Sequence, residues 1–120
     1  MILVDTSIWA DHFRSPIQSL LDCIVGAQII QHPFVTGELA LGNPAHRARM
    51  MAMLDILPPA TVIEHAALIE FIETQSIGGT GIGFVDAHLL ASATGTSCRL
   101  WTRDRRLAEQ AERLGLLHTA

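Results

Sequence analysis

The chain opens with MILVDTSIWADHF, residues 1–13, in which four apolar residues run directly into Asp5. Such an unbroken apolar run is typical of a strand covered on both faces in a parallel sheet. Ligand sites in these sheets lie beyond the carboxyl ends of the strands. Asp5 is therefore predicted to stand at the functional edge, where the hydroxyl residues Thr6 and Ser7 precede a helix over residues 8–14.

Length and composition indicate one folded domain over residues 1–120. A domain of this size buries roughly 65% of the surface of its unfolded chain, without the need for disulfide bonds or a structural metal. The 49% of hydrophobic residues exclude a disordered chain. The mean hydropathy of +0.33 is high for a small monomer. This surplus of apolar residues favours an apolar surface that contacts a partner.

The basic residues exclude several classes of site. All eight are arginine, which excludes the P-loop, Schiff-base lysines and receiver-type phosphoacceptor sites. The net charge of −4 argues against nucleic-acid binding by bulk electrostatics. A local basic patch is still compatible with the sequence, since four arginines are grouped near its end: Arg99, Arg103, Arg105 and Arg106.

Neither a thiol site nor a membrane segment is indicated. Cys23 and Cys98 have no CxxC spacing and no histidine at zinc-ligand spacing, which favours buried free thiols. No charged segment precedes an apolar core at the start, and no run approaches the roughly 18 apolar residues that span a bilayer. We therefore expect a cytoplasmic protein with no contact to a membrane.

The remaining chain alternates predicted helices with short predicted strands, as in an α/β fold. Helices are predicted over residues 8–14, 17–25, 37–41, 45–57, 64–75, 84–93 and 105–114. Strands are predicted over residues 1–4, 27–32, 61–63, 98–102 and 116–119. Thr36 is the predicted N-cap of the third helix. The glycine-rich loop over residues 76–83 follows a helix and lacks a GK[ST] ending, so it is interpreted as a connector.

Four carboxylates stand at the end of a predicted strand or near the start of a predicted helix: Asp5, Glu38, Asp86 and Asp104. In a doubly wound sheet these positions face one edge. Acids in a first helical turn also stabilise the helix dipole by about 0.3 to 1 kcal/mol each, with no function required. Glu38 and Asp104 are individually explained that way. Asp5 is not, because its burial must be offset by capping bonds or by a cation.

A hard divalent cation is the cofactor that such a cluster predicts. If the four acids gather, their repulsion raises their pKa values or requires an ion, because no lysine can neutralise them. Magnesium takes oxygen ligands, whereas zinc favours histidine or cysteine at spacings absent here. The histidines are scattered, and His88, two residues after Asp86, points to another helix face. A serine triad lacks the G-x-S-x-G elbow.

Four segments together resemble the PIN-domain ribonucleases, and more narrowly the VapC-like toxins of bacterial toxin-antitoxin pairs. They are VDTSIWADHF (residues 4–13), HPFVTGELALG (32–42), GFVDAHLLASA (83–93) and LWTRDRRL (100–107). In this order they span nearly the whole chain. The resemblance implies a three-layer α/β/α sandwich, with a parallel sheet of about five strands and an acidic pocket at its carboxyl edge.

The same resemblance implies endonucleolytic cleavage of RNA that depends on magnesium or manganese, with a metal-activated water in the acidic pocket. The catalytic and metal-binding acids of the family fall on Asp5, Glu38, Asp86 and Asp104, with Asp5 and Asp86 as the most secure ligands. Thr6, Ser7 and Thr102 are the supporting hydroxyls. Arg103, Arg105 and Arg106 are candidates to hold the RNA backbone.

Partners also follow from the resemblance. Such toxins are typically held inactive by a cognate antitoxin that covers the pocket, and they commonly pair as homodimers, which would account for the apolar surplus. Two other interpretations stay open from the sequence. One is a nuclease of the same architecture that acts in RNA processing or DNA repair. The other is a catalytically idle, metal-free binding module whose acids are only helix caps.

Overall fold

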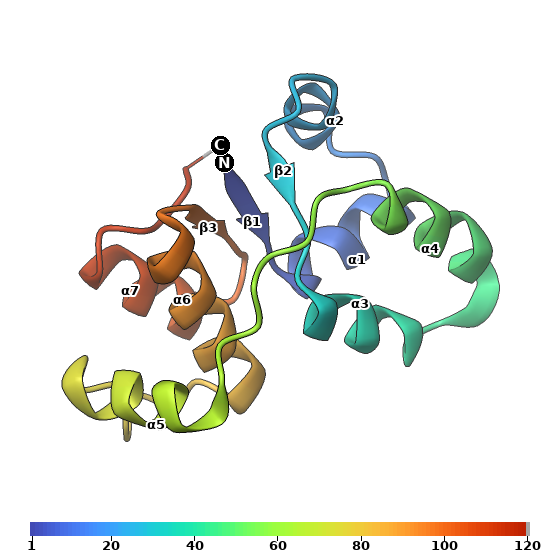
Figure 1. Ribbon diagram of the computed structural model, residues 1–120. Coiled ribbons are helices and arrows are strands. Elements are labelled where there is room, and N and C mark those ends of the chain that lie inside the picture. Colours follow the sequence, from blue (N-terminus) through green and yellow to red (C-terminus); the bar gives the residue numbers. More distant parts are fainter. Residues whose placement is uncertain (120) are drawn as a thin grey trace.

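A parallel sheet lies at the centre of the computed structural model, which describes residues 1–119. Its strand order is β2-β1-β3 (Figure 1). The strands are β1 (Ile2–Val4), β2 (Ile29–Ile30) and β3 (Arg99–Trp101). Ile2 of the central strand pairs with Ile29 on one side and with Arg99 on the other. The opening apolar run is thus a buried strand, as predicted, and it lies in the middle of the sheet.

The sheet is narrower than the expected five strands. Residues 61–63 form no strand, and the preceding segment contributes one parallel bridge, between Gln31 and Pro59. Proline has no N–H to donate, so a regular ladder cannot continue through it. At the opposite edge, one bridge joins Leu100 to Leu117 in place of the predicted final strand. Single bridges therefore extend a three-stranded parallel sheet on both sides.

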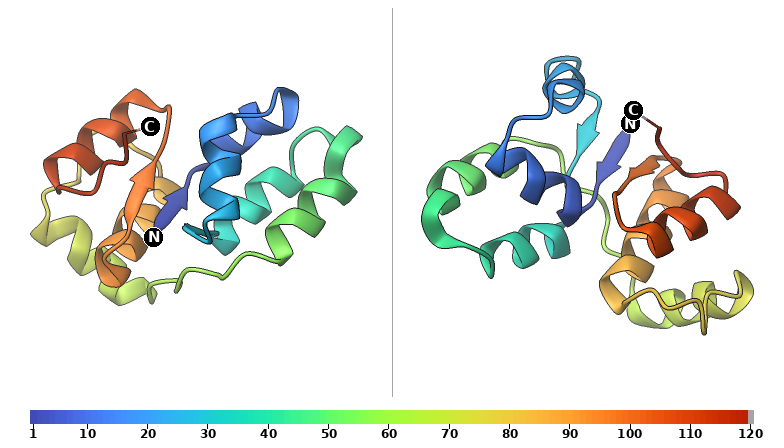
Figure 2. Two further views of the ribbon diagram at one scale, coloured as in Figure 1. Left: turned by 90° about the horizontal axis from the view of Figure 1, so that it is seen from above. Right: turned by 180° about the vertical axis from the view of Figure 1, so that it is seen from behind.

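Seven α-helices and one short 3-10 helix surround the sheet in the described residues 1–119. They are α1 (Thr6–Arg14), α2 (Gln18–Val25), α3 (Pro33–Ala40), η1 (Pro44–His46), α4 (Arg47–Asp55), α5 (His65–Thr74), α6 (Phe84–Thr96) and α7 (Arg105–Arg113). Figures 1 and 2 show α1 to α4 gathered on one side of β1 and α5 to α7 on the other. This arrangement confirms the predicted α/β class. None of these helices has both the length and the apolarity needed to cross a membrane.

The third helix begins earlier than predicted. Pro33 occupies its first turn, which suits the fixed φ of proline, and His32 is the N-cap. The ring nitrogen Nδ1 of His32 accepts the N–H of Phe34 at 3.0 Å. The predicted N-cap, Thr36, lies inside the helix, so that prediction is wrong. Glu38 consequently lies beyond the first turn of α3, and the helix dipole no longer explains its position.

Candidate active site

Asp5 is held at the carboxyl end of β1 by three hydrogen bonds. Its side chain is the N-cap of α1, and Oδ1 accepts the N–H of Thr6 at 2.7 Å. The hydroxyl groups of Ser7 and Thr102 donate to Oδ2 at 2.8 and 2.7 Å. Asp5 is only 5% exposed, so these donors offset the cost of burying the carboxylate. They also fix its orientation toward the edge of the sheet.

The end of β3 is tied to the same carboxylate. Thr102 follows the strand directly, and its hydroxyl oxygen accepts the N–H of Asp104 at 3.0 Å. The Ser7 hydroxyl oxygen accepts the N–H of Arg103 at 3.0 Å. Asp104 then caps α7 by accepting the N–H of Leu107 at 3.1 Å. The predicted supporting hydroxyls therefore join the first and third strands at one edge.

Glu38 and Asp86 come to this edge from α3 and α6. The Thr6 hydroxyl donates to Oε1 of Glu38 at 2.7 Å. Asp86 lies in the first turn of α6, where its Oδ2 accepts the N–H of Gly83 at 3.3 Å. The bond from Thr6 ties Glu38 to the start of α1, beside the end of β1, whereas the Gly83 bond is a local contact that holds Asp86 at the start of α6.

The charges of the other three acids act on Asp86. Burial, together with the negative charges of Asp5, Asp104 and Glu38, raises the pKa of Asp86 to about 6, against the opposing effect of the Gly83 hydrogen bond. Of the ion pairs in the described chain, two involve Asp11 and one involves Glu109. None of these ion pairs neutralises Asp5, Glu38, Asp86 or Asp104. We call these four acids the acid pocket.

The acid pocket fits a hydrated hard cation better than a preformed protein cage. Within residues 1–119, no three carboxylate, imidazole or thiol side chains are already close enough to hold an ion together. The acids are therefore not arranged as a preformed cage in the described residues. Magnesium is commonly held by one or two carboxylates with water completing its shell. The oxygen-only donors of the acid pocket suit this mode of binding.

Comparison with known proteins gives two curated relatives. Ribonuclease VapC32 of Mycobacterium tuberculosis, from strain CDC 1551 / Oshkosh and from strain ATCC 25618 / H37Rv, is 39% identical to this chain over 108 residues. The alignment covers 89% of this chain and 87% of each relative. The chain belongs to the VapC family of ribonucleases. Comparison with protein-family profiles gives no match. Membership of the VapC family confirms the resemblance to VapC-like, PIN-domain proteins.

A first prediction follows from the charge of the acid pocket in this VapC-family protein. Between pH 3.8 and about 6 the folded chain binds more protons at Asp86 than the unfolded chain does. The contribution of Asp86 to the stability of the folded chain is therefore fully present below the pKa of 3.8 that it has in the unfolded chain. This contribution is lost as the pH rises through about 6. In metal-free buffer at neutral pH, Asp86→Asn is expected to raise the free energy of unfolding by about 1 kcal/mol after solvent screening.

Urea unfolding of wild type and Asp86→Asn across this pH range measures the effect. Wild type should lose stability relative to the variant as pH rises, and saturating magnesium should remove the advantage of the variant. Asp22→Asn is the matched control, because Asp22 is exposed on α2 and bonds only to Gln18 among the described side chains. A loss of more than about 2 kcal/mol in metal-free Asp86→Asn would contradict a crowded acid pocket.

The three arginines predicted to hold RNA lie in different surroundings. Arg103 turns toward α1 and pairs with Asp11 at 2.5 Å. Arg105 pairs along its own helix with Glu109 at 3.7 Å. The side chain of Arg106 covers Gly81, where an added Cβ would lie 2.9 Å from its Nη1. Of the three, Arg103 is the one directly linked to the acid pocket, through Ser7.

His32 links the two helices that carry Glu38 and Asp86, a role that the sequence did not predict. It is fully buried, and because Nδ1 accepts from Phe34, Nε2 is the donor to the Ser92 hydroxyl oxygen at 3.1 Å. The Ser92 hydroxyl in turn donates to the carbonyl of Thr61 at 2.7 Å. This network joins the start of α3, which carries Glu38, to α6. A histidine directly before a helix-starting proline is the local signal that could have indicated it.

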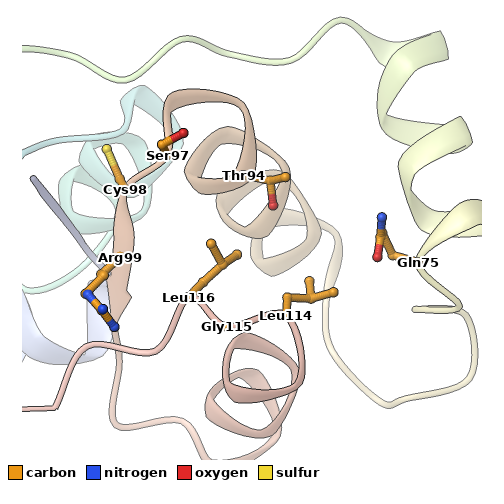
Figure 3. A pocket seen from close by; sticks show the side chains of 8 residues that line it. All are labelled: Gln75, Thr94, Ser97, Cys98, Arg99, Leu114, Gly115 and Leu116. Atoms are coloured by element: carbon orange, nitrogen blue, oxygen red, sulfur yellow. The ribbon is translucent and has the colours of Figure 1, made fainter.

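A separate cavity of about 420 Å³ lies at the opposite end of β3 (Figure 3). Cys98 and Arg99, at the start of that strand, line it together with Leu116. No residue of the acid pocket lines this cavity. Because ligand sites in parallel sheets favour the carboxyl edge, the acid pocket is the candidate active site of this VapC-family chain.

Proposed function

We propose that this protein is a metal-dependent endoribonuclease that acts in the cytoplasm as the toxin of a toxin-antitoxin pair. The observation that carries the proposal is that the charges of Asp5, Glu38 and Asp104 act on Asp86, while no ion pair in the described residues neutralises any of the four acids. The identity of 39% with a ribonuclease over 89% of the chain supports the same activity.

Mg²⁺ or Mn²⁺ is the proposed cofactor. Asp5 and Asp86 are its proposed direct ligands, and Glu38 and Asp104 bind it directly, through water, or as ligands of a second ion. When bound, such an ion supplies Lewis-acid activation of a water nucleophile and neutralises charge on the phosphate. The oxygen-only donors and the raised pKa of Asp86 support this assignment.

The neighbouring side chains keep the acids in position. Ser7 and Thr102 direct their hydroxyl protons to one oxygen of Asp5, which leaves that carboxylate little freedom to rotate. Thr6 holds Glu38 in the same way. Because the donors come from α1 and from the end of β3, correct placement of the acids requires the whole sheet edge to be assembled.

We extend the proposal to protein partners, namely a cognate antitoxin that covers the acid pocket and a second copy of this chain. Large apolar side chains at the surface support the existence of such interfaces: Val25 and Leu41 are each 88% exposed, and Ile56 is 76% exposed. Leu41 directly follows α3, the helix that carries Glu38. Where such exposed side chains join into a contiguous patch, they mark a contact surface.

The decisive experiment is a titration of antitoxin-free protein with magnesium and manganese in the presence of a mixed RNA pool. Cleavage is expected only with the ion, with a rise in the melting temperature of the protein as the ion binds. Single-stranded and duplex DNA of matching sequence are the control substrates, and chelator added mid-reaction should stop cleavage.

Each alternative has its own outcome in this experiment. Cleavage of DNA in preference to RNA would favour a repair nuclease of the same architecture. An absence of cleavage, together with no metal-induced rise in melting temperature, would support an idle binding module and would leave the acids as helix caps. Confinement of cleavage to one structured RNA would favour RNA processing.

A further inference from the structure

A polar stripe on α1 leads away from the acid pocket. Ser7, Asp11 and Arg14 are spaced four and three residues apart, so they share one face of the helix. At its start, Ser7 donates to Asp5. At its end, Arg14 lies about 10 Å farther along the helix axis, from the rise of an α-helix. The stripe therefore connects the acid pocket to a guanidinium group.

Arg103 lies along the same stripe. Its N–H donates to Ser7 Oγ at 3.0 Å, and its guanidinium donates to Asp11 Oδ2 at 2.5 Å. The other oxygen of Asp11 accepts from the guanidinium of Arg14. These two arginines lower the pKa of Asp11, so the carboxylate between them stays charged. Arg14, Asp11 and Arg103, which we call the arginine cradle, carry a net charge of +1.

The arginine cradle faces solvent and adjoins the acid pocket. The side chain of Arg14 is 76% exposed and that of Arg103 is 53% exposed. A surface hollow of about 650 Å³ is lined by all three cradle residues. A second hollow, of about 460 Å³, has Arg14, Thr6 and Glu38 in its wall. Arg14 thus borders both hollows and joins the cradle to the acid pocket.

The chemistry of the cradle suits a phosphodiester. Each guanidinium has five N–H donors, and within residues 1–119 each donates one hydrogen bond to Asp11. The remaining donors of two neighbouring planar groups match the two free oxygens of a phosphodiester, and the net charge of +1 matches its single negative charge. A carboxylate between the arginines pre-orders both side chains, which lowers the entropy lost on binding.

We propose that the arginine cradle binds an RNA phosphodiester adjacent to the one cleaved in the acid pocket. This inference rests on the proposed function, since it assigns part of the substrate path to that same site. Contacts of this kind fix the position of the strand and carry no sequence information. Arg14 is thereby a substrate-binding residue that the grouping of arginines in the sequence does not reveal.

The test compares the double variant Arg14→Gln/Arg103→Gln with wild type and with Arg99→Gln. Arg99 lies beside the separate cavity at the other end of β3 (Figure 3), where its guanidinium donates to the carbonyl of Leu117. The double variant should raise KM for short single-stranded RNA about tenfold and keep kcat within about twofold. The slope of log affinity against log salt should fall by about 0.7, the value for one phosphate contact on a single strand.

A second readout separates failure of this inference from failure of the proposed function. Fluorescence anisotropy of a labelled single-stranded RNA of random sequence reports binding in chelator, without cleavage. Arg14→Lys/Arg103→Lys should restore the salt slope, since it keeps both charges, and should recover only part of the affinity. Circular dichroism and melting temperature verify that each variant is folded.

Two outcomes would overturn the arginine cradle as an RNA site. One is a double variant whose KM, affinity and salt slope equal those of Arg99→Gln, while wild type cleaves RNA normally. The other is a fall in kcat at unchanged KM, because a neighbouring phosphate contact should act on binding. If wild type cleaves no RNA with any metal ion, the proposed function fails. Weaker binding of the labelled RNA by the double variant would in that case still support the arginine cradle as an RNA-binding site.

Discussion

Replacement of Asp5 by asparagine is expected to lower metal-dependent RNA cleavage by about a thousandfold, equivalent to about 4 kcal/mol of transition-state stabilisation. Asparagine keeps the shape of the side chain but removes its negative charge. Its amide oxygen can still accept the N–H of Thr6, as Oδ1 of Asp5 does at 2.7 Å. The lost charge therefore weakens binding of the cation far more than it disturbs the cap of α1.

The fold should tolerate this change. Ser7 and Thr102 now donate to Oδ2 of Asp5, and as hydroxyl groups they can turn and accept from an amide instead. We expect a loss of about 1 kcal/mol or less in the free energy of unfolding. Single-turnover cleavage at saturating manganese measures the effect, with Asp22→Asn on α2 as the matched control. Activity within tenfold of wild type in Asp5→Asn would remove Asp5 from the active site.

Replacement of His32 by glutamine is expected to cause the largest loss of stability, a decrease of about 2 kcal/mol in the free energy of unfolding at neutral pH. Both ring nitrogens of this buried histidine are used, by Phe34 and by Ser92. Glutamine cannot hold both partners with the same geometry. The loss should be visible as a lower urea midpoint with an unchanged m-value.

The pH dependence identifies the imidazole as the cause. Burial, helped by the charge of His88, lowers the pKa of His32 from 6.5 to about 4. The folded chain therefore binds fewer protons there than the unfolded chain does. The stability contributed by neutral His32 is fully present above pH 6.5 and is lost as pH falls through about 4. The difference between wild type and His32→Gln should consequently narrow in acid.

Titration of Asp86 changes stability in the opposite direction over the same pH range. The effect of His32→Gln is therefore best measured in proteins that already carry Asp86→Asn. Asp86→Asn and Asp86→Asn/His32→Gln should differ by about 2 kcal/mol near neutral pH and by less than about 1 kcal/mol near pH 4.5. His46→Gln, at an exposed histidine of η1, is the control for general effects of histidine. A difference that stays constant with pH would exclude His32 as the titrating group.

Local patterns in the sequence were sufficient for several parts of the structure. Four apolar residues before Asp5 predicted a buried strand, because such a run is typical of a strand covered on both faces. Asp104 was predicted near the start of the last helix and is the N-cap of α7, since capping depends on residues only a few positions apart. Four short segments were also sufficient to indicate the family, which the two relatives confirm.

Other features depended on contacts between distant segments. Ser7 and Thr102, which share the carboxylate of Asp5, are 95 residues apart, and no local pattern connects them. The bond between His32 and Ser92, which ties the start of α3 to α6, joins residues 60 positions apart. The outer position beside β2 is a single bridge, because Pro59 cannot donate a hydrogen bond to a ladder.

The sequence by itself thus determined the α/β class, the buried first strand and the acids predicted to form the site, because burial and capping act over a few residues. The tertiary structure alone decided how those acids are oriented, which hydroxyls hold them and which arginines stand beside them. Arg103 meets Asp11 across 92 positions of the chain. Its surroundings therefore depend on how β3 and α1 pack, and this packing brings it to Arg14.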